Sequence, residues 1–163
     1  MTIILLLFGH LLMGQQTNYI DVESVRTAIE LDPFKKEVTG KVQMNLTVLK
    51  PVDSLIIDAK KMAFEAVTLN STKAKYSVTD NHLIVYHFFQ PGNTSELSFS
   101  YRAQPKKALY FIDWEYLNEP DISGGQIWTQ GQGKYTSNWL PSFDDMNEKA
   151  EFDLSISFDH NYE

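Results

Sequence analysis

Two glutamines carry the clearest chemical signal in this sequence. They alternate with glycines in the run Gln130-Gly131-Gln132-Gly133. If this segment is extended, both side chains project to the same side and their amides address one ligand. An amide oxygen accepts a hydrogen bond from an ammonium group without needing a charge of its own. The alternative is that both amides bond to the backbone of their own loop.

Composition and spacing argue against several other kinds of site. The chain has no cysteine, which excludes a disulfide framework, a thiolate metal site and a cysteine nucleophile. His82 and His87 are five residues apart in a strand-like run, so they point to opposite faces and do not form the i, i+4 pair of a zinc-binding helix. With 14 basic and 21 acidic residues the net charge is -7, which argues against nucleic-acid binding.

The first sixteen residues predict a secretory signal. Apolar runs from Ile3 to Phe8 and from Leu11 to Met13 end at Gly14-Gln15-Gln16. This apolar part is about a dozen residues long, well short of the ~20 that span a bilayer as a helix. We expect residues 1–16 to be removed on export and residues 17–163 to form the mature domain, with no transmembrane segment left. The protein is then periplasmic, attached to the cell envelope or extracellular, whereas a buried N-terminal strand is the alternative.

Most of the remaining chain shows the two-residue alternation of half-buried strands. The clearest case runs from Val38 to Val48, and the same pattern recurs from Leu97 to Tyr101 and from Phe152 to Phe158. Shorter β-rich runs occupy residues 54–57, 67–69, 76–79 and 83–89, with turn residues between them. The pattern predicts one all-β domain with a saddle-shaped or sandwich-like arrangement of mixed, mostly antiparallel sheets.

The stretch from residue 110 to residue 145 breaks this alternation and is rich in Gly, Gln, Trp and Tyr. After the glutamines this stretch contains Pro141-Ser-Phe-Asp144, and Lys149-Ala-Glu-Phe152 follows shortly beyond it. These blocks resemble the N-terminal domain of the zinc aminopeptidases related to aminopeptidase N and the leukotriene-hydrolase-type enzymes. In that family Gln-x-Gln/Glu precedes Pro-Cys-x-Asp-x-Pro-x-x-Lys-Ala-x-Phe, and the domain is a saddle of mixed β-sheets.

A weaker likeness lies upstream. Leu31-Asp32-Pro33 and Thr39-Gly40 resemble the first β-hairpin of the same family, whose second strand opens with a glycine. The resemblance thus spans most of the mature chain. Ser142 and Met146 depart from it, because the family often has Cys and Pro there.

The resemblance implies a role for each matching residue. Gln132 would meet the free α-amine of a peptide substrate, and Gln130 would support that segment. Pro141, Asp144, Lys149 and Phe152 would be structural, with Asp144 and Lys149 fixing the corner that packs on the next domain. The family's zinc is held by His-Glu-x-x-His plus a downstream Glu, and that motif is not in this sequence. We therefore expect a non-catalytic N-terminal fragment, truncated at its C-terminus, whose zinc and catalytic domain belong to the parent enzyme.

A stand-alone binding module is the alternative function. Exported β-domains bind carbohydrate through exposed aromatic side chains, and a third possibility is a scaffold that binds a protein partner. The aromatic side chains are equally suited to a core. The candidates for a sugar-stacking face are Tyr110, Trp114, Tyr116, Trp128, Tyr135 and Trp139.

Overall fold

The computed structural model describes residues 16–114 and 124–159. Within them the chain is nearly all β, and its helical turns are short 3-10 segments such as η1 (Gln16–Asn18) and η3 (Thr136–Asn138). No helix in the described part is long and apolar enough to cross a membrane. The strands are β1 (Ile20–Asp32), β2 (Glu37–Val48), β3 (Val52–Asp58), β4 (Met62–Leu69), β5 (Thr72–Lys73), β6 (Lys75–Val78), β7 (His82–Phe89), β8 (Thr94–Ala103), β9 (Leu109–Ile112), β10 (Gln126–Thr129) and β11 (Glu151–Ser157).

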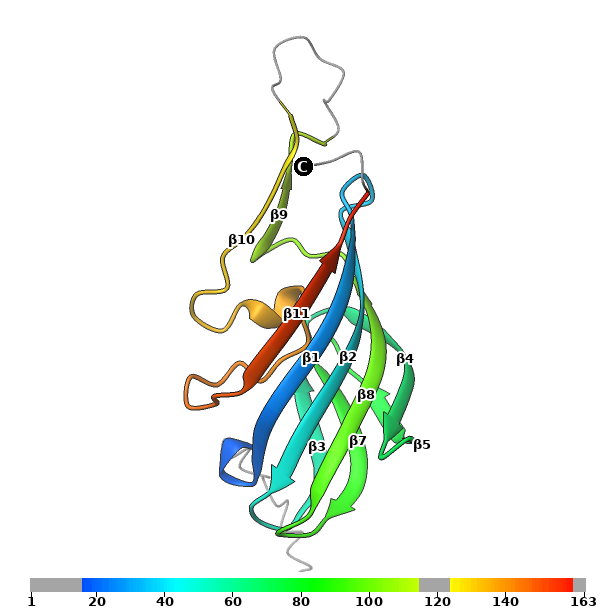
Figure 1. Cartoon of the computed structure of the whole chain (residues 1–163), viewed down its shortest axis with the longest axis vertical. Coiled ribbons are helices and arrows are strands. Elements are labelled where there is room, and N and C mark those ends of the chain that lie inside the picture. The colour runs from blue at the N-terminus through cyan, green and yellow to red at the C-terminus, as the bar shows by residue number, and fades with distance from the viewer. Residues whose placement is uncertain (1–15, 115–123, 160–163) are drawn as a thin grey trace, which may run out of the picture.

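The main sheet has six strands in the order β11-β1-β2-β8-β4-β5. β1 and β11 run parallel, whereas the other neighbours are antiparallel. A three-stranded sheet, β3-β7-β6, shares one apolar core with it, and β9 and β10 form a separate hairpin at the upper end of the molecule in Figure 1. The predicted fold class, all-β with mixed and mostly antiparallel sheets, is confirmed.

The strands predicted from alternation are present, and on β2 and β8 every second residue is buried as expected. β1 and most of β4 were not predicted by the alternation. Each contains an irregularity in register, between Val22 and Ser24 in β1 and between Glu65 and Thr68 in β4. An extra residue at a β-bulge moves the following side chains to the other face. The buried positions of β1 accordingly switch from even to odd numbers, which hides the period of two.

β11 corrects one expectation. The alternation predicts a half-buried strand, and the strand is present, but all seven of its residues are exposed. Phe152, Leu154 and Ile156 pair with the buried β1 residues Val25, Thr27 and Ile29. Paired residues on neighbouring strands face the same side of a sheet. These three side chains, the β11 row, therefore extend the core face of the main sheet beyond the elements that cover it.

The predicted signal segment lies almost wholly outside the described residues. Its last residue, Gln16, is in η1 and contacts the backbone of β3. The Gln16 Nε2 atom donates to the carbonyl of Ser54 at 3.1 Å, and the Gln16 Oε1 atom accepts from the amide of Ile56 at 2.8 Å. The side chain thereby satisfies two backbone groups on the edge of β3.

Candidate functional site

The β9–β10 hairpin presents the two glutamines. Gln130 follows the last residue of β10, and its amide donates to the carbonyl of Ala108 at 2.8 Å. The Thr129 hydroxyl donates to the same carbonyl at 2.6 Å. Gln132 lies two residues further on, where the chain enters a turn. The regular strand thus ends before either glutamine, so a continued strand does not set their relative orientation.

Both glutamine side chains are free to bind a ligand. Gln130 and Gln132 are exposed, and neither side-chain amide has a hydrogen-bond partner among the described residues. The alternative, in which these amides bond to their own loop, is therefore not realised in the described part of the chain. Their donors and acceptors face solvent.

The turn after Gln132 has an unusual backbone. Gly133 and Lys134 have φ values of 74° and 69°, in the left-handed region. That region is easy for glycine but costly for a residue with a Cβ atom. Gly131 has a different reason to be small, because a Cβ atom there would lie 2.8 Å from the Thr136 hydroxyl oxygen. The glycines thus allow a tight return of the chain into η3.

The Pro141–Asp144 block is tied to the end of β3. Pro141 and Ser142 are buried, and Ser142 forms an isolated antiparallel bridge with Asp58. The two backbone hydrogen bonds of this bridge are 2.8 and 3.0 Å long. The amide of Asp144 also donates to the Asp58 Oδ2 atom at 2.9 Å. These three hydrogen bonds with Asp58 therefore fix the segment that follows η3.

The Asp144 side chain accepts several hydrogen bonds. It is 8% exposed, and it takes hydrogen bonds from the hydroxyl and the amide of Ser137, the latter at 3.4 Å. The Ser142 hydroxyl donates to the Asp144 Oδ1 atom at 3.0 Å. Within this domain the Asp144 carboxylate thus joins η3 to the Pro141–Asp144 block, and its predicted role at the corner with the next domain stays a prediction. The departure from the family pattern at Ser142 supplies one of its donors.

The other two motif residues lie at the surface. Lys149 is exposed, and Phe152, 52% exposed, begins the β11 row. The carboxylate of Glu148, next to Lys149, accepts a hydrogen bond from the amide of Val22 at 3.1 Å, beside the register shift in β1. Partial burial raises the pKa of the Glu148 carboxyl.

Comparison with known families agrees with this arrangement. A family model described as the Peptidase M1 N-terminal domain matches residues 16–163. The chain belongs to the M1 peptidase family. It carries the N-terminal domain of that family, and the resemblance stated from the sequence is confirmed.

Relatives of this M1 domain are much longer than the chain. Leucine aminopeptidase 2 of Yarrowia lipolytica is 24% identical over 160 residues, covering 88% of this chain and 23% of the relative. The M1 zinc metallopeptidase of Deinococcus radiodurans has a TM-score of 0.72 at 16% identity, covering 86% of this chain and 33% of that protein. Leukotriene A4 hydrolase of Saccharomyces cerevisiae has a TM-score of 0.72 at 17% identity, covering 86% and 23%. The chain thus spans a quarter to a third of these proteins.

The two histidines that the structure describes, His82 and His87, occupy ordinary positions in β7. His82 Nε2 lies 3.5 Å from the Asp58 Oδ1 atom, and the His87 ring packs edge-on against Phe89 with centroids 4.9 Å apart. No group of three or more His, Cys, Asp or Glu side chains in the described ranges is arranged to hold a metal ion. The described residues therefore do not fit the family's zinc.

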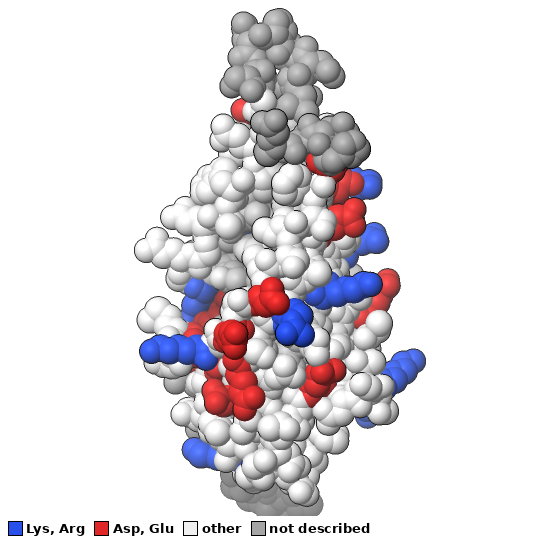
Figure 2. Space-filling view, in the orientation of Figure 1, with Lys and Arg blue, Asp and Glu red and all other residues white. Residues whose placement is uncertain are grey.

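The aromatic side chains divide between core and surface. Trp114 and Trp139 are each 7% exposed and belong to the core, which supports the packing interpretation for both. Trp128 is 43% exposed and stacks on Tyr110 with ring centroids 4.5 Å apart. Tyr116 lies outside the described residues. In Figure 2 the surface over β9 and β10 is largely uncharged.

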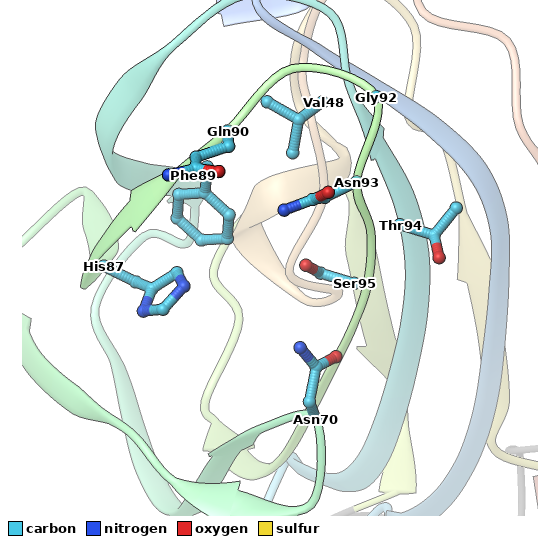
Figure 3. Close-up of a pocket in the computed structure, with 9 residues that line it drawn as sticks. All are labelled: Val48, Asn70, His87, Phe89, Gln90, Gly92, Asn93, Thr94 and Ser95. Carbon is cyan, nitrogen blue, oxygen red and sulfur yellow. The ribbon is translucent and has the colours of Figure 1, made fainter.

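Two surface pockets lie away from the glutamines. One, of about 340 Å³, is lined by polar groups near the β7–β8 turn, including Asn70, His87, Gln90 and Asn93 (Figure 3). The other, of about 540 Å³, lies on the main sheet around Tyr101. Neither pocket includes Gln130 or Gln132 in its lining. Both glutamines therefore lie at the surface, outside these two pockets.

Proposed function

We propose that this chain forms one wall of the active site of an exported zinc aminopeptidase and that Gln132 accepts a hydrogen bond from the free α-amine of the peptide substrate. Gln130 supports the same segment. Peptide hydrolysis is then carried out by the zinc-bearing part of the longer parent enzyme. Holding the substrate by its free amine fixes how many residues enter the catalytic centre, which favours removal of N-terminal amino acids over internal cleavage.

The observation that carries this proposal is the exposed and unpartnered state of both glutamine side chains. An exposed amide without a protein partner is hydrogen-bonded to water, which a ligand can displace. Here the loop around Gln132 is well anchored while the amide itself stays open. The family, and the leucine aminopeptidase activity for which the Yarrowia lipolytica relative is named, agree with a role in peptide N-terminus recognition. A variant of the Deinococcus radiodurans enzyme is bound to a Tyr-Ser-Ala substrate, which is a peptide ligand of that protein.

The β11 row supports a partner next to this domain. Phe152, Leu154 and Ile156 are 52%, 41% and 48% exposed. Burying side chains of this size is worth about 1.5–3 kcal/mol each when complete. A contiguous apolar row on an edge strand is typical of an interaction surface. The catalytic part of the parent polypeptide is the partner proposed for it.

Kinetics of a full-length parent with Gln132→Ala test the amine contact. A hydrogen bond to a charged group contributes about 1.5–3 kcal/mol, so kcat/KM for aminoacyl and peptide substrates should fall about tenfold to a hundredfold. Zinc content should not change. The matched control is Gln90→Ala, which truncates an exposed glutamine in the β7–β8 turn.

Two outcomes decide the proposal. A fall in kcat/KM confined to Gln132→Ala, with N-terminally acetylated substrates unaffected by the substitution, would support it. Unchanged kinetics of Gln132→Ala over several free-amine substrates would overturn the assignment. For the alternative of a stand-alone glycan-binding module, a glycan-array signal lost in Trp128→Ala would be the supporting result.

A further inference from the structure

Lys60 joins the β3–β4 turn to the loop that carries Gln132. Its backbone amide donates to the carbonyl of Ser137 at 2.7 Å, and its Nζ atom donates to the carbonyl of Lys134 at 2.9 Å. Lys60 therefore holds both ends of the four-residue turn that follows Gly133. We propose that Lys60 is a positioning residue for Gln132, an inference that rests on the proposed function.

The ammonium group of Lys60 is itself held from several directions. Its Nζ atom lies 3.7 Å from the Asp144 Oδ2 atom and 5.7 Å from the centroid of the Tyr135 ring. The Lys60 side chain is 35% exposed, whereas that of Asp144 is 8% exposed. A Lys ammonium has three donors, and here one goes to a backbone carbonyl while a carboxylate and an aromatic face stabilise the charge. These contacts therefore hold the Lys60 ammonium group in one position.

The backbone of the turn explains why such an anchor matters. Lys134 has φ at 69°, a conformation that costs energy for a residue with a Cβ atom and persists where surrounding contacts hold it. The hydrogen bond from Lys60 ends on the carbonyl of this residue. On the other side of Gln132, the amide of Gln130 is held by the carbonyl of Ala108. Gln132 thus lies between two anchored points, and its open side chain takes its position from them.

No motif or spacing in the sequence indicates this role for Lys60. Lys60 lies 74 residues before its partner Lys134. Its neighbour Lys61 is an exposed lysine in the same turn, and its side chain has no hydrogen bond or ion pair among the described residues. Lys61→Met is therefore a matched control for Lys60→Met, since both keep a long apolar stem and remove one charge. Lys60→Arg keeps the charge and the donors.

Amide hydrogen exchange on the 163-residue chain tests the anchor. The amides of Asn138 and Trp139 bond to Tyr135 and Thr136, so they report opening of the turn. They should exchange about two- to fivefold faster in Lys60→Met than in Lys61→Met, as expected for a partly exposed pair, and Lys60→Arg should restore protection. Equal exchange in the two methionine variants would overturn the inference. If Lys60→Met does not fold, Lys60→Gln, which keeps a donor without the charge, takes its place in both experiments.

Kinetics of the full-length parent test whether the anchor acts through Gln132. Lys60→Met should raise KM for free-amine peptides about two- to fivefold with kcat and zinc content unchanged. In a Gln132→Ala background the same substitution should have no further effect on KM, whereas a merely structural role would add its cost in both backgrounds. An effect of Gln132→Ala without any effect of Lys60→Met would overturn this inference and leave the proposed function standing. No effect of Gln132→Ala would overturn the proposed function, and this inference with it.

Discussion

The Asp144 carboxylate and the Ser137 hydroxyl form a hydrogen bond that closes the loop between the glutamines and the Pro141–Asp144 block. The amide of Ser137 points to the same carboxylate at 3.4 Å, and both residues are largely buried. The contact spans seven residues of chain. It makes the loop that carries the glutamines and the motif that follows it one structural unit.

Asp144→Asn should therefore destabilise the domain. The amide nitrogen of asparagine is a donor, and at least one of the groups now donating to Asp144 would lose its acceptor. The expected loss is about 1–3 kcal/mol of unfolding free energy. Urea denaturation measures it, with Asp80→Asn in an exposed turn as the control. Equal midpoints for the two variants would show that the carboxylate is not needed.

Gln16→Ala should also lower the stability of the domain. The side chain donates to the carbonyl of Ser54 and accepts from the amide of Ile56, so its removal leaves two groups of β3 without a protein partner. Each such bond contributes about 0.5–1.5 kcal/mol. Thermal unfolding of a chain that begins before Gln16 measures the loss. Gln15→Ala is the neighbouring comparison, and a larger effect there would contradict this role of Gln16.

The fold could be predicted where strands are regular and could not where they are irregular. The alternation along β2 predicts both the strand and its buried face, because one side chain in two meets the core. In β1 and β4 a register shift changes which positions are buried, and a fixed period of two misses the strand. β11 shows the opposite failure. Its alternation is perfect, but burial needs a covering layer, which the sequence of a strand does not report.

The residues of the candidate site could also be predicted only in part from the sequence. Gln130, Gln132 and Asp144 could be found because they lie in a short motif, and the structure describes all three. Lys60 and Asp58 could not, since their contacts with the 134–144 segment are made by the fold across long sequence separations. Gly40 falls between these cases. The resemblance predicts a glycine there, and the structure supplies the reason, because a Cβ atom at Gly40 would lie 2.4 Å from the Tyr101 Cε1 atom.

Tyr101→Phe should be close to neutral in stability at pH 7. The Tyr101 hydroxyl is buried and has no hydrogen-bond partner among the described residues, so its removal leaves no group newly unpaired. The ring still packs over Gly40. We expect a change within about 1 kcal/mol, or a gain in stability. Urea denaturation at pH 7 measures it, and a loss of more than about 2 kcal/mol would indicate that the hydroxyl has a partner such as a buried water.

The same substitution should change the pH dependence of unfolding. Burial raises the pKa of Tyr101 above its ordinary value of 10.0. Above pH 10 the unfolded chain releases the phenolic proton while the folded chain keeps it, so the free energy of unfolding falls as pH rises. Tyr101→Phe should lose less stability between pH 9 and pH 11 than the unchanged chain. Tyr19→Phe, at an exposed tyrosine, is the control, and parallel curves for all three proteins would contradict the prediction.

Leu154→Asp should reduce dye binding and self-association of the isolated chain without unfolding it. The β11 row is exposed here, so a charge placed in it meets water instead of a core. Binding of a hydrophobic dye and self-association at high concentration should both fall relative to Ser155→Asp, which places the same charge on the adjacent residue of β11, facing the other side of the sheet.

In the full-length parent, Leu154→Asp should instead be the more harmful of the two substitutions. If the catalytic part covers this row, Leu154→Asp buries a charge and costs at least about 2 kcal/mol of stability, whereas Ser155→Asp stays near neutral. Equal behaviour of the two variants in the parent would show that the row is not where the rest of the enzyme docks.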